Sequence, residues 1–255
     1  MKYKKISFVA GATKQALKAK KELESIYGSQ LPEDADIIIA LGGDGLMLQT
    51  LHQYINSNKP IYGMNLGSIG FLMNEFDKKN LNERISKAEI VKVNLLKMTV
   101  TDSKNNIYDE LAINEVSLFR TSYQAAKLKI SVDGKLRLKE LICDGIMVAT
   151  PAGSTAYNLS ANGPILPINA KLLSLMPINA FRPRRWKGAL LNINSEIDIE
   201  VIDHKHRHVS ATADSREIKQ AKRIKITIEK DKEIRLMFDP DYSLDERIIR
   251  EQFLT

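Results

Sequence analysis

Residues 37–51 read IIIALGGDGLMLQTL, and this stretch joins a continuous apolar run to a glycine-rich turn and an amphipathic pattern. The run Ile37 to Leu41 has the composition of a central parallel strand that is buried on both faces. Beyond the turn, apolar residues recur at helical spacing, and a second apolar run follows from Ile61 to Leu66. A strand, a turn, a helix and a second strand in this order predict a βαβ unit.

The neighbouring segments extend this pattern in both directions. Ile6 to Val9 suits a strand, and Thr13 is placed to cap a helix that follows it. The apolar residues expected on one face of that helix are Ala16, Ala19, Leu23, Ile26 and Tyr27. Asp77 predicts the cap of a further helix. We therefore expect an α/β domain of the nucleotide-binding kind over residues 1–97.

From about residue 90 the apolar residues alternate with a period of two, which is typical of antiparallel sheet. Asp133-Gly134 lies between two such runs and predicts a two-residue hairpin turn. These patterns predict an all-β domain, mostly an antiparallel β-sandwich, over residues 98–237. Leu244, Ile248 and Ile249 are spaced for a short helix, so residues 238–255 are expected to pack back on the α/β domain.

Composition narrows the classes of partner. The chain has 255 residues, 44% of them hydrophobic, with a formal net charge of +7, which favours anionic partners in general. Aromatic residues make up only 6% and basic residues are scattered, so we expect neither nucleic acid nor a membrane as partner. No apolar run approaches the ~18 residues that span a bilayer, and Cys143 is the only cysteine. The expected location is the cytoplasm.

The turn Gly42-Gly43-Asp44-Gly45 is the first candidate site, because ligands of open α/β sheets bind at the carboxyl ends of the strands. Glycines let backbone N–H groups approach phosphate oxygens, and the following helix start favours an anion. A carboxylate beside phosphates needs a divalent cation between them, or a hydroxyl that donates its proton to it. Both arrangements suit a kinase, although Asp44 is equally suited to cap the next helix.

Two further segments carry polar groups in unusual places. Gly153-Ser154-Thr155-Ala156-Tyr157 follows an apolar strand and precedes a helical turn, so it can bind a phosphate or a base edge, or simply start a capped helix. Asn114-Glu115 interrupts a strand pattern between Ile113 and Val116. This pair marks a site or a solvent-facing stretch of strand.

In this order and at these separations, the three segments resemble the NAD kinase family. The segment from Asn65 to Leu72 is similar to the second glycine-rich segment of that family, so the resemblance spans most of residues 37–160. It implies ATP as phosphoryl donor, a divalent metal ion such as Mg²⁺, and phosphorylation of NAD at the 2′-hydroxyl of its adenosine ribose to give NADP. Two positions depart from the family pattern: Leu46 replaces a common threonine, and Ala213-Asp214-Ser215 replaces a more usual Asp-Gly pair.

The resemblance also implies roles for individual residues. Asp44 would orient or deprotonate the accepting hydroxyl, and Gly42, Gly43 and Gly45 would make room for the donor phosphates. The residues that the resemblance places around NAD are Asp44, Gly45, Phe71, Asn114, Glu115, Asp144, Thr155, Ala156, Tyr157 and Ser160. The counterpart of Asp144 often reaches the site of a neighbouring subunit, which implies a homo-oligomer, a dimer or tetramer, with shared active sites. No metal ligand is assigned on the protein.

Two alternatives remain from the residues themselves. A lipid kinase can carry the same Gly-Gly-Asp-Gly turn, and a non-catalytic dinucleotide-binding regulator would also suit the basic charge. Residues 182–185 (Arg-Pro-Arg-Arg) are expected to form a solvated loop. The alternating His204, His206 and His208 are expected on an exposed hairpin rather than around a metal.

Overall fold

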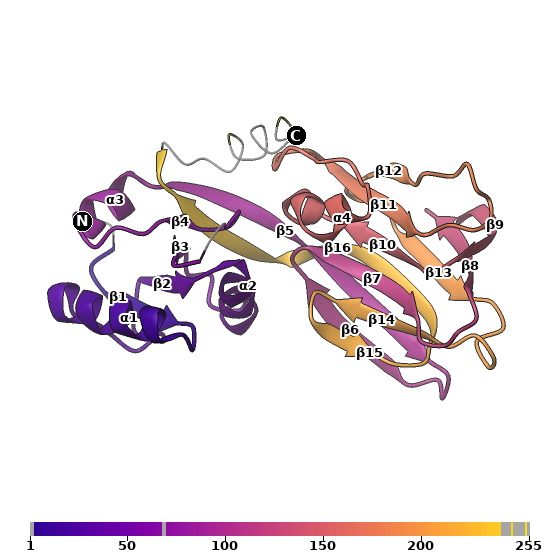
Figure 1. The fold of residues 1–255 in the computed structure, drawn as a ribbon, viewed down its shortest axis with the longest axis horizontal. Coiled ribbons are helices and arrows are strands. Elements are labelled where there is room, and N and C mark those ends of the chain that lie inside the picture. The colour runs from indigo at the N-terminus through magenta and orange to yellow at the C-terminus, as the bar shows by residue number, and fades with distance from the viewer. Residues whose placement is uncertain (1–2, 68–69, 241–245, 247–252, 254–255) are drawn as a thin grey trace. The chain divides into compact units, whose positions relative to one another are not determined.

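The computed structural model describes residues 3–67, 70–240, 246 and 253. The chain forms two compact units: Met1–Val93 with Asp231–Thr255 is unit 1, and Asn94–Lys230 is unit 2 (Figure 1). Among the described residues, none of the helices has both the length and the apolar character needed to cross a bilayer. The helix expected over residues 244–253 lies outside the described residues, apart from Glu246 and Phe253.

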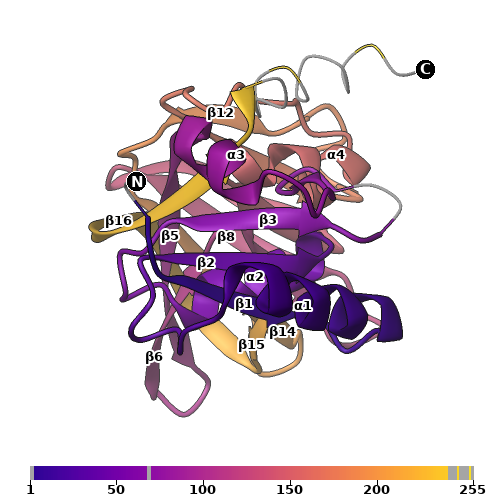
Figure 2. The same cartoon turned by 90° about the vertical axis from the view of Figure 1, so that its left-hand side faces the viewer.

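Unit 1 is built on parallel strands, as the apolar runs predict. β2 (Ile37–Gly42) lies between β1 (Ile6–Ala10) and β3 (Ile61–Asn65), and all three run parallel (Figure 2). The start of β3 also pairs with the end of β16 (Ala221–Phe238), and its end pairs with the short β4 (Asn74–Glu75). Residues 37–41 are completely buried, so β2 is the central strand that the sequence predicts.

Within residues 3–67 and 70–93, unit 1 contains three helices. The first, α1 (Lys14–Tyr27), starts at Thr13, whose Oγ1 accepts the Ala16 N–H at 3.2 Å, as predicted. It buries Ala16, Ala19 and Leu23, but Ile26 is exposed, so this part of the predicted apolar face is wrong. The helix turns Ile26 away from the sheet because the buried positions already fill the face that meets it. The second helix, α2 (Asp44–Gln53), begins directly after the glycine turn.

The third helix does not begin where the sequence suggests. α3 (Leu81–Lys87) is preceded by Asn80, which has a left-handed backbone with φ of 54°. Asp77 instead accepts the Lys79 N–H at 2.9 Å and forms a local turn. Asp77 is therefore not a helix cap, because its side chain satisfies an amide only two residues away.

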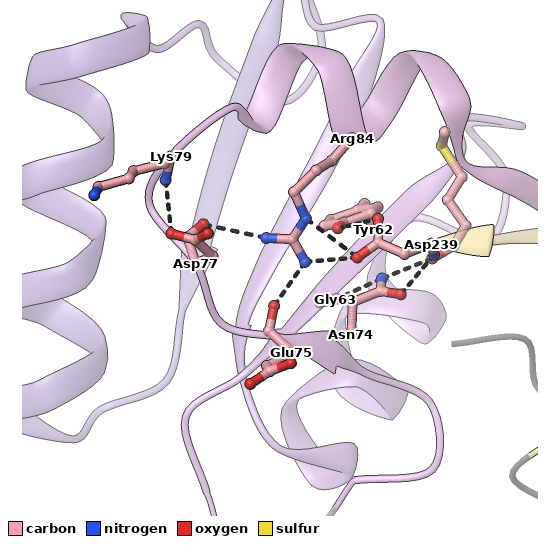
Figure 3. Close-up of polar contacts among 9 residues, drawn as sticks. Tyr62, Gly63, Asn74, Glu75, Asp77, Lys79, Arg84 and Asp239 are labelled. Atoms are coloured by element: carbon pink, nitrogen blue, oxygen red, sulfur yellow. Dashed lines mark hydrogen bonds and ion pairs between the residues drawn. The ribbon is translucent and has the colours of Figure 1, made fainter. Parts of the chain in front are cut away.

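A polar network in unit 1 connects α3 to the end of β16 (Figure 3). Asp239 accepts the Tyr62 hydroxyl at 2.7 Å and Arg84 Nη2 at 2.6 Å. Asn74 bridges neighbouring strands, because its Nδ2 donates to the carbonyls of Gly63 and Met237. Burial, and then the hydrogen bond to Asp239, raises the pKa of Tyr62 above its ordinary value. The network joins residues that are far apart in the sequence.

Unit 2 contains two sets of antiparallel strands. The first set runs in the order β12 (Ala189–Asn192), β11 (Leu172–Ile178), β10 (Gly145–Ala149), β7 (Glu115–Arg120), β14 (Val209–Ala213) and β15 (Arg216–Ile218). The second comprises β13 (Ile197–Val201), β8 (Ala126–Val132), β9 (Lys135–Cys143), β6 (Ile107–Ala112) and the unit 2 parts of β5 (Glu89–Asp102) and β16. One core cluster draws on both, for example Val116 and Ile146 with Ile130 and Ile199.

Two local features of unit 2 follow directly from its sequence. Asp133 and Gly134 both have positive φ, at 53° and 71°, and join β8 to β9 as the predicted two-residue turn. After β10 the chain forms a short 3-10 helix, η1 (Ala152–Thr155), and one turn of helix, α4 (Tyr157–Ser160). An α/β unit followed by an antiparallel β unit confirms the predicted fold class.

Candidate functional site

The candidate residues of unit 1 lie where β2 ends and α2 begins. Asp44 is the first residue of α2, and both of its carboxylate oxygens accept backbone N–H groups from a distant segment. Oδ2 accepts the Phe71 amide at 2.8 Å, and Oδ1 accepts the Leu72 amide at 2.9 Å. Asp44 thus does not cap its own helix. Its carboxylate instead connects the two glycine-rich segments that the sequence analysis identified separately.

Backbone contacts reinforce this junction. The Leu66 amide donates to the Gly42 carbonyl at 2.7 Å, and Asn65 Oδ1 accepts the Gly67 amide at 2.9 Å. The turn glycines differ in what surrounds them. A Cβ on Gly43 or Gly45 would meet nothing within 4 Å, whereas one on Gly42 would lie 2.6 Å from Leu46 Cδ2. Open space thus lies beside Gly43 and Gly45, whereas the side chain of Leu46 occupies the space beside Gly42.

The candidate residues of unit 2 begin at Asn114 and Glu115, where the chain enters β7. The carboxylate of Asp214 accepts three successive amides here: Ile113 at 2.7 Å, Asn114 at 2.9 Å and Glu115 at 3.2 Å. Asp214 lies in the turn between β14 and β15. The sequence analysis noted Asp214 only as a departure from a family pattern and assigned it no part in the site.

The side chains of this pair are poorly satisfied. Asn114 Oδ1 and Glu115 Oε2 are buried, and neither has a hydrogen-bond partner in the part of the chain that the structure describes. Burial, with the nearby Asp214 charge as a second cause, raises the pKa of Glu115 to about 7. Buried acceptors without partners are uncommon in folded proteins and indicate a place where a ligand or water can donate.

The segment after β10 packs against the backbone of residues 113–115, which we call the corner. Thr150 Oγ1 donates to the Ile113 carbonyl at 2.7 Å, and the Thr150 amide donates to the Asn114 carbonyl at 2.9 Å. Gly153 approaches so closely that a Cβ there would lie 2.1 Å from the Asn114 carbonyl oxygen. The structure therefore brings Asn114, Glu115 and the segment from Gly153 to Tyr157 together, although about 40 residues separate them in the sequence.

Two buried polar residues, Ser154 and Asn158, hold the segment around η1 and α4. Ser154 and Asn158 are fully buried, and Ser154 Oγ both donates to the Pro151 carbonyl and accepts the Leu166 amide. Thr155 and Ala156 are half-buried, and Ser160 is exposed. The Tyr157 ring is partly exposed and lies 5.8 Å from the Phe119 ring, centre to centre. Asn158 was not named from the sequence, because an asparagine in a helical turn carries no signal that separates it from an ordinary surface residue.

Asp144 belongs to a different cluster. It accepts Arg120 Nε at 2.5 Å and Asn179 Nδ2 at 3.0 Å, and these contacts lower the pKa of its carboxyl, the Asn179 bond most. In the β7–β10 register, Ala149 pairs with Glu115 and Gly145 pairs with Phe119. Asp144 therefore lies at the opposite end of this strand pair from Glu115, roughly 17 Å away at the usual rise per residue.

Residues 182–185, His206 and His208 are exposed, and His204 is half-buried. Arg182 and Arg184 lie over the ring of Phe181, at 5.6 and 5.5 Å, in an exposed loop. His206 pairs with Asp203 in a turn. Within residues 3–67 and 70–240, no group of three or more His, Cys, Asp or Glu side chains is placed to hold a metal ion.

A glycine turn at the carboxyl end of a central parallel strand is where open α/β proteins bind their ligands, and glycine turns of this kind are typical of nucleotide-binding proteins. Comparison with known proteins gives the family. Residues 2–90 match the model of the ATP-NAD kinase N-terminal domain, and residues 113–232 match that of the ATP-NAD kinase C-terminal domain. The chain belongs to the NAD kinase family, which confirms the resemblance.

Individual relatives agree. The NAD kinase of Rhizobium meliloti is 51% identical over 252 residues, which cover 99% of this chain and 98% of that protein. The NAD kinase of Brucella suis is 52% identical over 97% of this chain and 96% of that protein. Yeast NADH kinase, solved with NADH, has the same fold, with a TM-score of 0.86 over 98% of this chain and 87% of that one, at 21% identity. An Archaeoglobus fulgidus NAD kinase, solved with ATP, has a TM-score of 0.74 over 97% of this chain and 96% of that one, at 24% identity.

Proposed function

We propose that this chain phosphorylates NAD: it transfers the γ-phosphoryl group of ATP to the 2′-hydroxyl of the adenosine ribose and so produces NADP and ADP. The observation that carries this proposal is the full-length similarity to NAD kinases that are about half identical to the chain. The similarity extends over both units rather than over the glycine turn alone. No feature of the described residues favours either alternative.

Asp44 is the proposed catalytic residue. Its two bonds to the Phe71 and Leu72 amides fix the plane of the carboxylate, and each oxygen retains a lone pair for another donor. The ribose hydroxyl donates its proton to this carboxylate while its oxygen forms the new bond to the γ-phosphorus. The bond between that phosphorus and the bridging oxygen breaks, and ADP leaves with the electron pair.

The donor phosphates are assigned to the turn itself. The open space beside Gly43 and Gly45 allows a phosphate to approach the backbone at the start of α2, a helix of ten residues whose N-terminus favours negative charge. Gly42 contributes by letting Leu46 pack beside it, which sets the course of the turn. A divalent ion such as Mg²⁺ would neutralise the phosphates. We assign it mainly to the substrate oxygens, since the described residues offer it no cluster of ligands.

The adenosine part of the dinucleotide is assigned to the buried acceptors of unit 2. Asn114 Oδ1 and Glu115 Oε2 can accept from amino or hydroxyl groups of the adenosine. Thr155, Ala156 and the partly exposed Tyr157 flank it on the segment after β10, and Ser160 is further along that segment. Gly45 and Phe71 complete the set proposed from the resemblance.

The proposal of a homo-oligomer rests on the resemblance at Asp144. Within one subunit this carboxylate is held by Arg120 and Asn179 at the far end of β7 and β10 from Glu115. The role of Asp144 towards a neighbouring subunit is therefore proposed from the resemblance alone. We propose a dimer or tetramer with shared sites, acting in the cytoplasm.

Incubation of the purified protein with NAD, ATP and magnesium tests the proposal. We expect NADP to form, as detected with an NADP-specific dehydrogenase, and to require ATP. Replacement of magnesium by chelator should stop the reaction. A protein that binds NAD but forms no NADP under these conditions would favour the regulator, and binding to liposomes with lipid phosphorylation would favour the lipid kinase.

A further inference from the structure

We propose that Asp214 is a positioning residue of the dinucleotide site, and that its carboxylate fixes the direction in which Asn114 and Glu115 present their side chains. The inference rests on the proposed function, because it concerns the same site. Asp214 itself need not touch the substrate. It acts through the backbone of residues 113–115, from a turn about 100 residues further along the chain.

The contacts form a closed set. Asp214 Oδ2 accepts the Ile113 amide, and Oδ1 accepts the amides of Asn114 and Glu115. In return, the Asp214 amide donates to the Glu115 carbonyl at 3.1 Å. Hydrogen bonds to a charged acceptor are the stronger kind. Three successive N–H groups that converge on one carboxylate leave the backbone of this corner little freedom to rotate.

The turn that carries Asp214 does not itself need a carboxylate. Asp214 has a left-handed backbone with φ of 50°, a conformation that glycine adopts most readily and aspartate tolerates. A glycine would therefore suit the turn at least as well. The side chain at this position is explained by the three amides that it binds rather than by the turn.

The opposite side of the corner is also held. Thr150 binds the carbonyls of Ile113 and Asn114, and Gly153 packs directly against the Asn114 carbonyl. A corner free to rotate could turn Asn114 Oδ1 and Glu115 Oε2 towards a donor. Because the backbone is fixed, the two acceptors stay buried and unpaired in the described structure. Asp214 thereby keeps them available for the ligand.

The charge of Asp214 has a second effect on the same pair. After burial, it is the cause that raises the pKa of Glu115. Near neutral pH, Glu115 therefore exchanges its proton readily, so it can either accept from a hydroxyl or donate to an oxygen of the ligand. Removal of the Asp214 charge should lower the pKa of Glu115. Substitution of a residue that only shapes the turn would leave this pKa unchanged, so the pKa of Glu115 distinguishes the two roles.

The test compares Asp214→Gly with Asp133→Gly. Asp133 is a close match: it also has a left-handed backbone, accepts the Glu196 amide at 2.9 Å and donates its own amide to the Glu196 carbonyl. It lies in the β8–β9 turn and has no part in the proposed site. We expect Asp214→Gly to raise the KM for NAD by about 10-fold to 100-fold, because the variant loses hydrogen bonds to a charged acceptor. Asp133→Gly should leave the KM for NAD unchanged. The KM for ATP should stay within about twofold of the wild type.

Asp214→Asn serves as a second variant, since asparagine also tolerates a left-handed backbone. It keeps one acceptor oxygen, but its amide group would face an N–H donor. We expect a KM for NAD between those of the wild type and Asp214→Gly, and a pH profile of kcat/KM for NAD whose Glu115 limb moves to lower pH. Calorimetric titration with NAD should show the same order of affinities.

The outcomes separate the two proposals. If the wild type forms no NADP, the proposed function fails, and the NAD affinities of the variants still decide the role of Asp214. If Asp214→Gly and Asp214→Asn bind NAD as tightly as the wild type, the positioning role is wrong. Equal losses in Asp214→Gly and Asp133→Gly, with matching falls in Tm, would also overturn it in favour of a general folding role.

Discussion

Asp44 and Glu115 are both carboxylates, but their surroundings give them different properties. Asp44 is held by two backbone amides, which fix the plane of its carboxylate. Glu115 has a buried oxygen that no described group bonds, and its pKa is raised to about 7. The fixed carboxylate of Asp44 is suited to orient a hydroxyl, and Glu115 is suited to exchange a proton near neutral pH.

The first prediction concerns Asp44→Asn. An amide of the same shape can still accept from one of the Phe71 and Leu72 amides, but it cannot accept a proton. We expect kcat to fall by about 10²-fold to 10⁴-fold, with the affinity for NAD little changed. Asp77→Asn is the control, since Asp77 also accepts a backbone amide in unit 1 but lies in an exposed turn. Undiminished turnover in Asp44→Asn would remove Asp44 from the mechanism.

The second prediction concerns the pH dependence of stability. Because the pKa of Glu115 is 4.5 ordinarily and about 7 when folded, the folded protein binds more protons there between these values than the unfolded chain. The free energy of unfolding therefore falls as the pH rises through this window. We expect Glu115→Gln to gain up to about 3 kcal/mol over the wild type at pH 8 and little at pH 4.5, measured by urea unfolding.

The control for this effect is Glu200→Gln, because Glu200 has a side chain that is 55% exposed and pairs with Lys129 at the surface. Its substitution should change stability by less than about 1 kcal/mol at either pH. A Glu115→Gln difference that is the same at pH 4.5 and pH 8 would show that Glu115 does not titrate in this window.

Among the elements, the contact between η1 and the start of β7 shapes the site of unit 2. Thr150, at the end of β10, and Gly153, in η1, meet the backbone of residues 113 and 114 directly. No side chain separates the two segments at Gly153. Because Gly153 has no Cβ, η1 and the start of β7 can approach each other this closely. A single glycine thus determines how two elements distant in the sequence pack together.

The third prediction follows from that contact. Gly153→Ala would place a Cβ 2.1 Å from the Asn114 carbonyl oxygen, a backbone atom that cannot move aside without shifting the corner. We expect a loss of roughly 1–3 kcal/mol in stability and a larger relative loss in NAD affinity than in ATP affinity. Gly11→Ala is the control for stability, since its Cβ would meet its nearest atoms at an ordinary 3.9 Å. Normal NAD binding by Gly153→Ala would contradict the assignment.

For the whole molecule, the decisive feature is that the chain leaves unit 1 at Val93 and returns to it at Asp231. The returning segment brings Asp239 to Tyr62 and Arg84, across 177 and 155 residues of sequence (Figure 3). The side chains of Arg84 and Asp239 are only 18% and 12% exposed. Unit 1 is therefore completed by a polar contact between two segments that lie on either side of unit 2 in the sequence.

The fourth prediction is that Asp239→Ala destabilises unit 1 strongly. It leaves the Arg84 charge and the buried Tyr62 hydroxyl without their shared acceptor, which costs about 3–5 kcal/mol for a buried pair. Glu83→Ala on the same helix removes an ion pair with Lys87 whose side chains are 59% and 66% exposed, and should change stability very little. Urea unfolding checks both, and similar losses in the two variants would contradict the role of the network.

Much of the fold could be predicted from local patterns. The buried strand at residues 37–41, the glycine turn that follows and the Asp133-Gly134 hairpin all depend on neighbours along the chain, and the structure confirms them. The prediction of a helix cap at Asp77 was wrong. The Asp77 side chain accepts the amide of Lys79, and the helix begins only at Leu81, after this local turn.

The sequence by itself determined the two kinds of sheet, because apolar periodicity records which faces of a strand are buried, and it determined the identities of the reactive groups. Only the tertiary structure decided that Asp44 binds the amides of Phe71 and Leu72, that Asp214 holds Asn114 and Glu115, and that burial raises the pKa of Glu115. The physical reason is range. Hydrogen bonds and burial act over a few ångströms in space, and spacing along a chain does not fix which residues come that close.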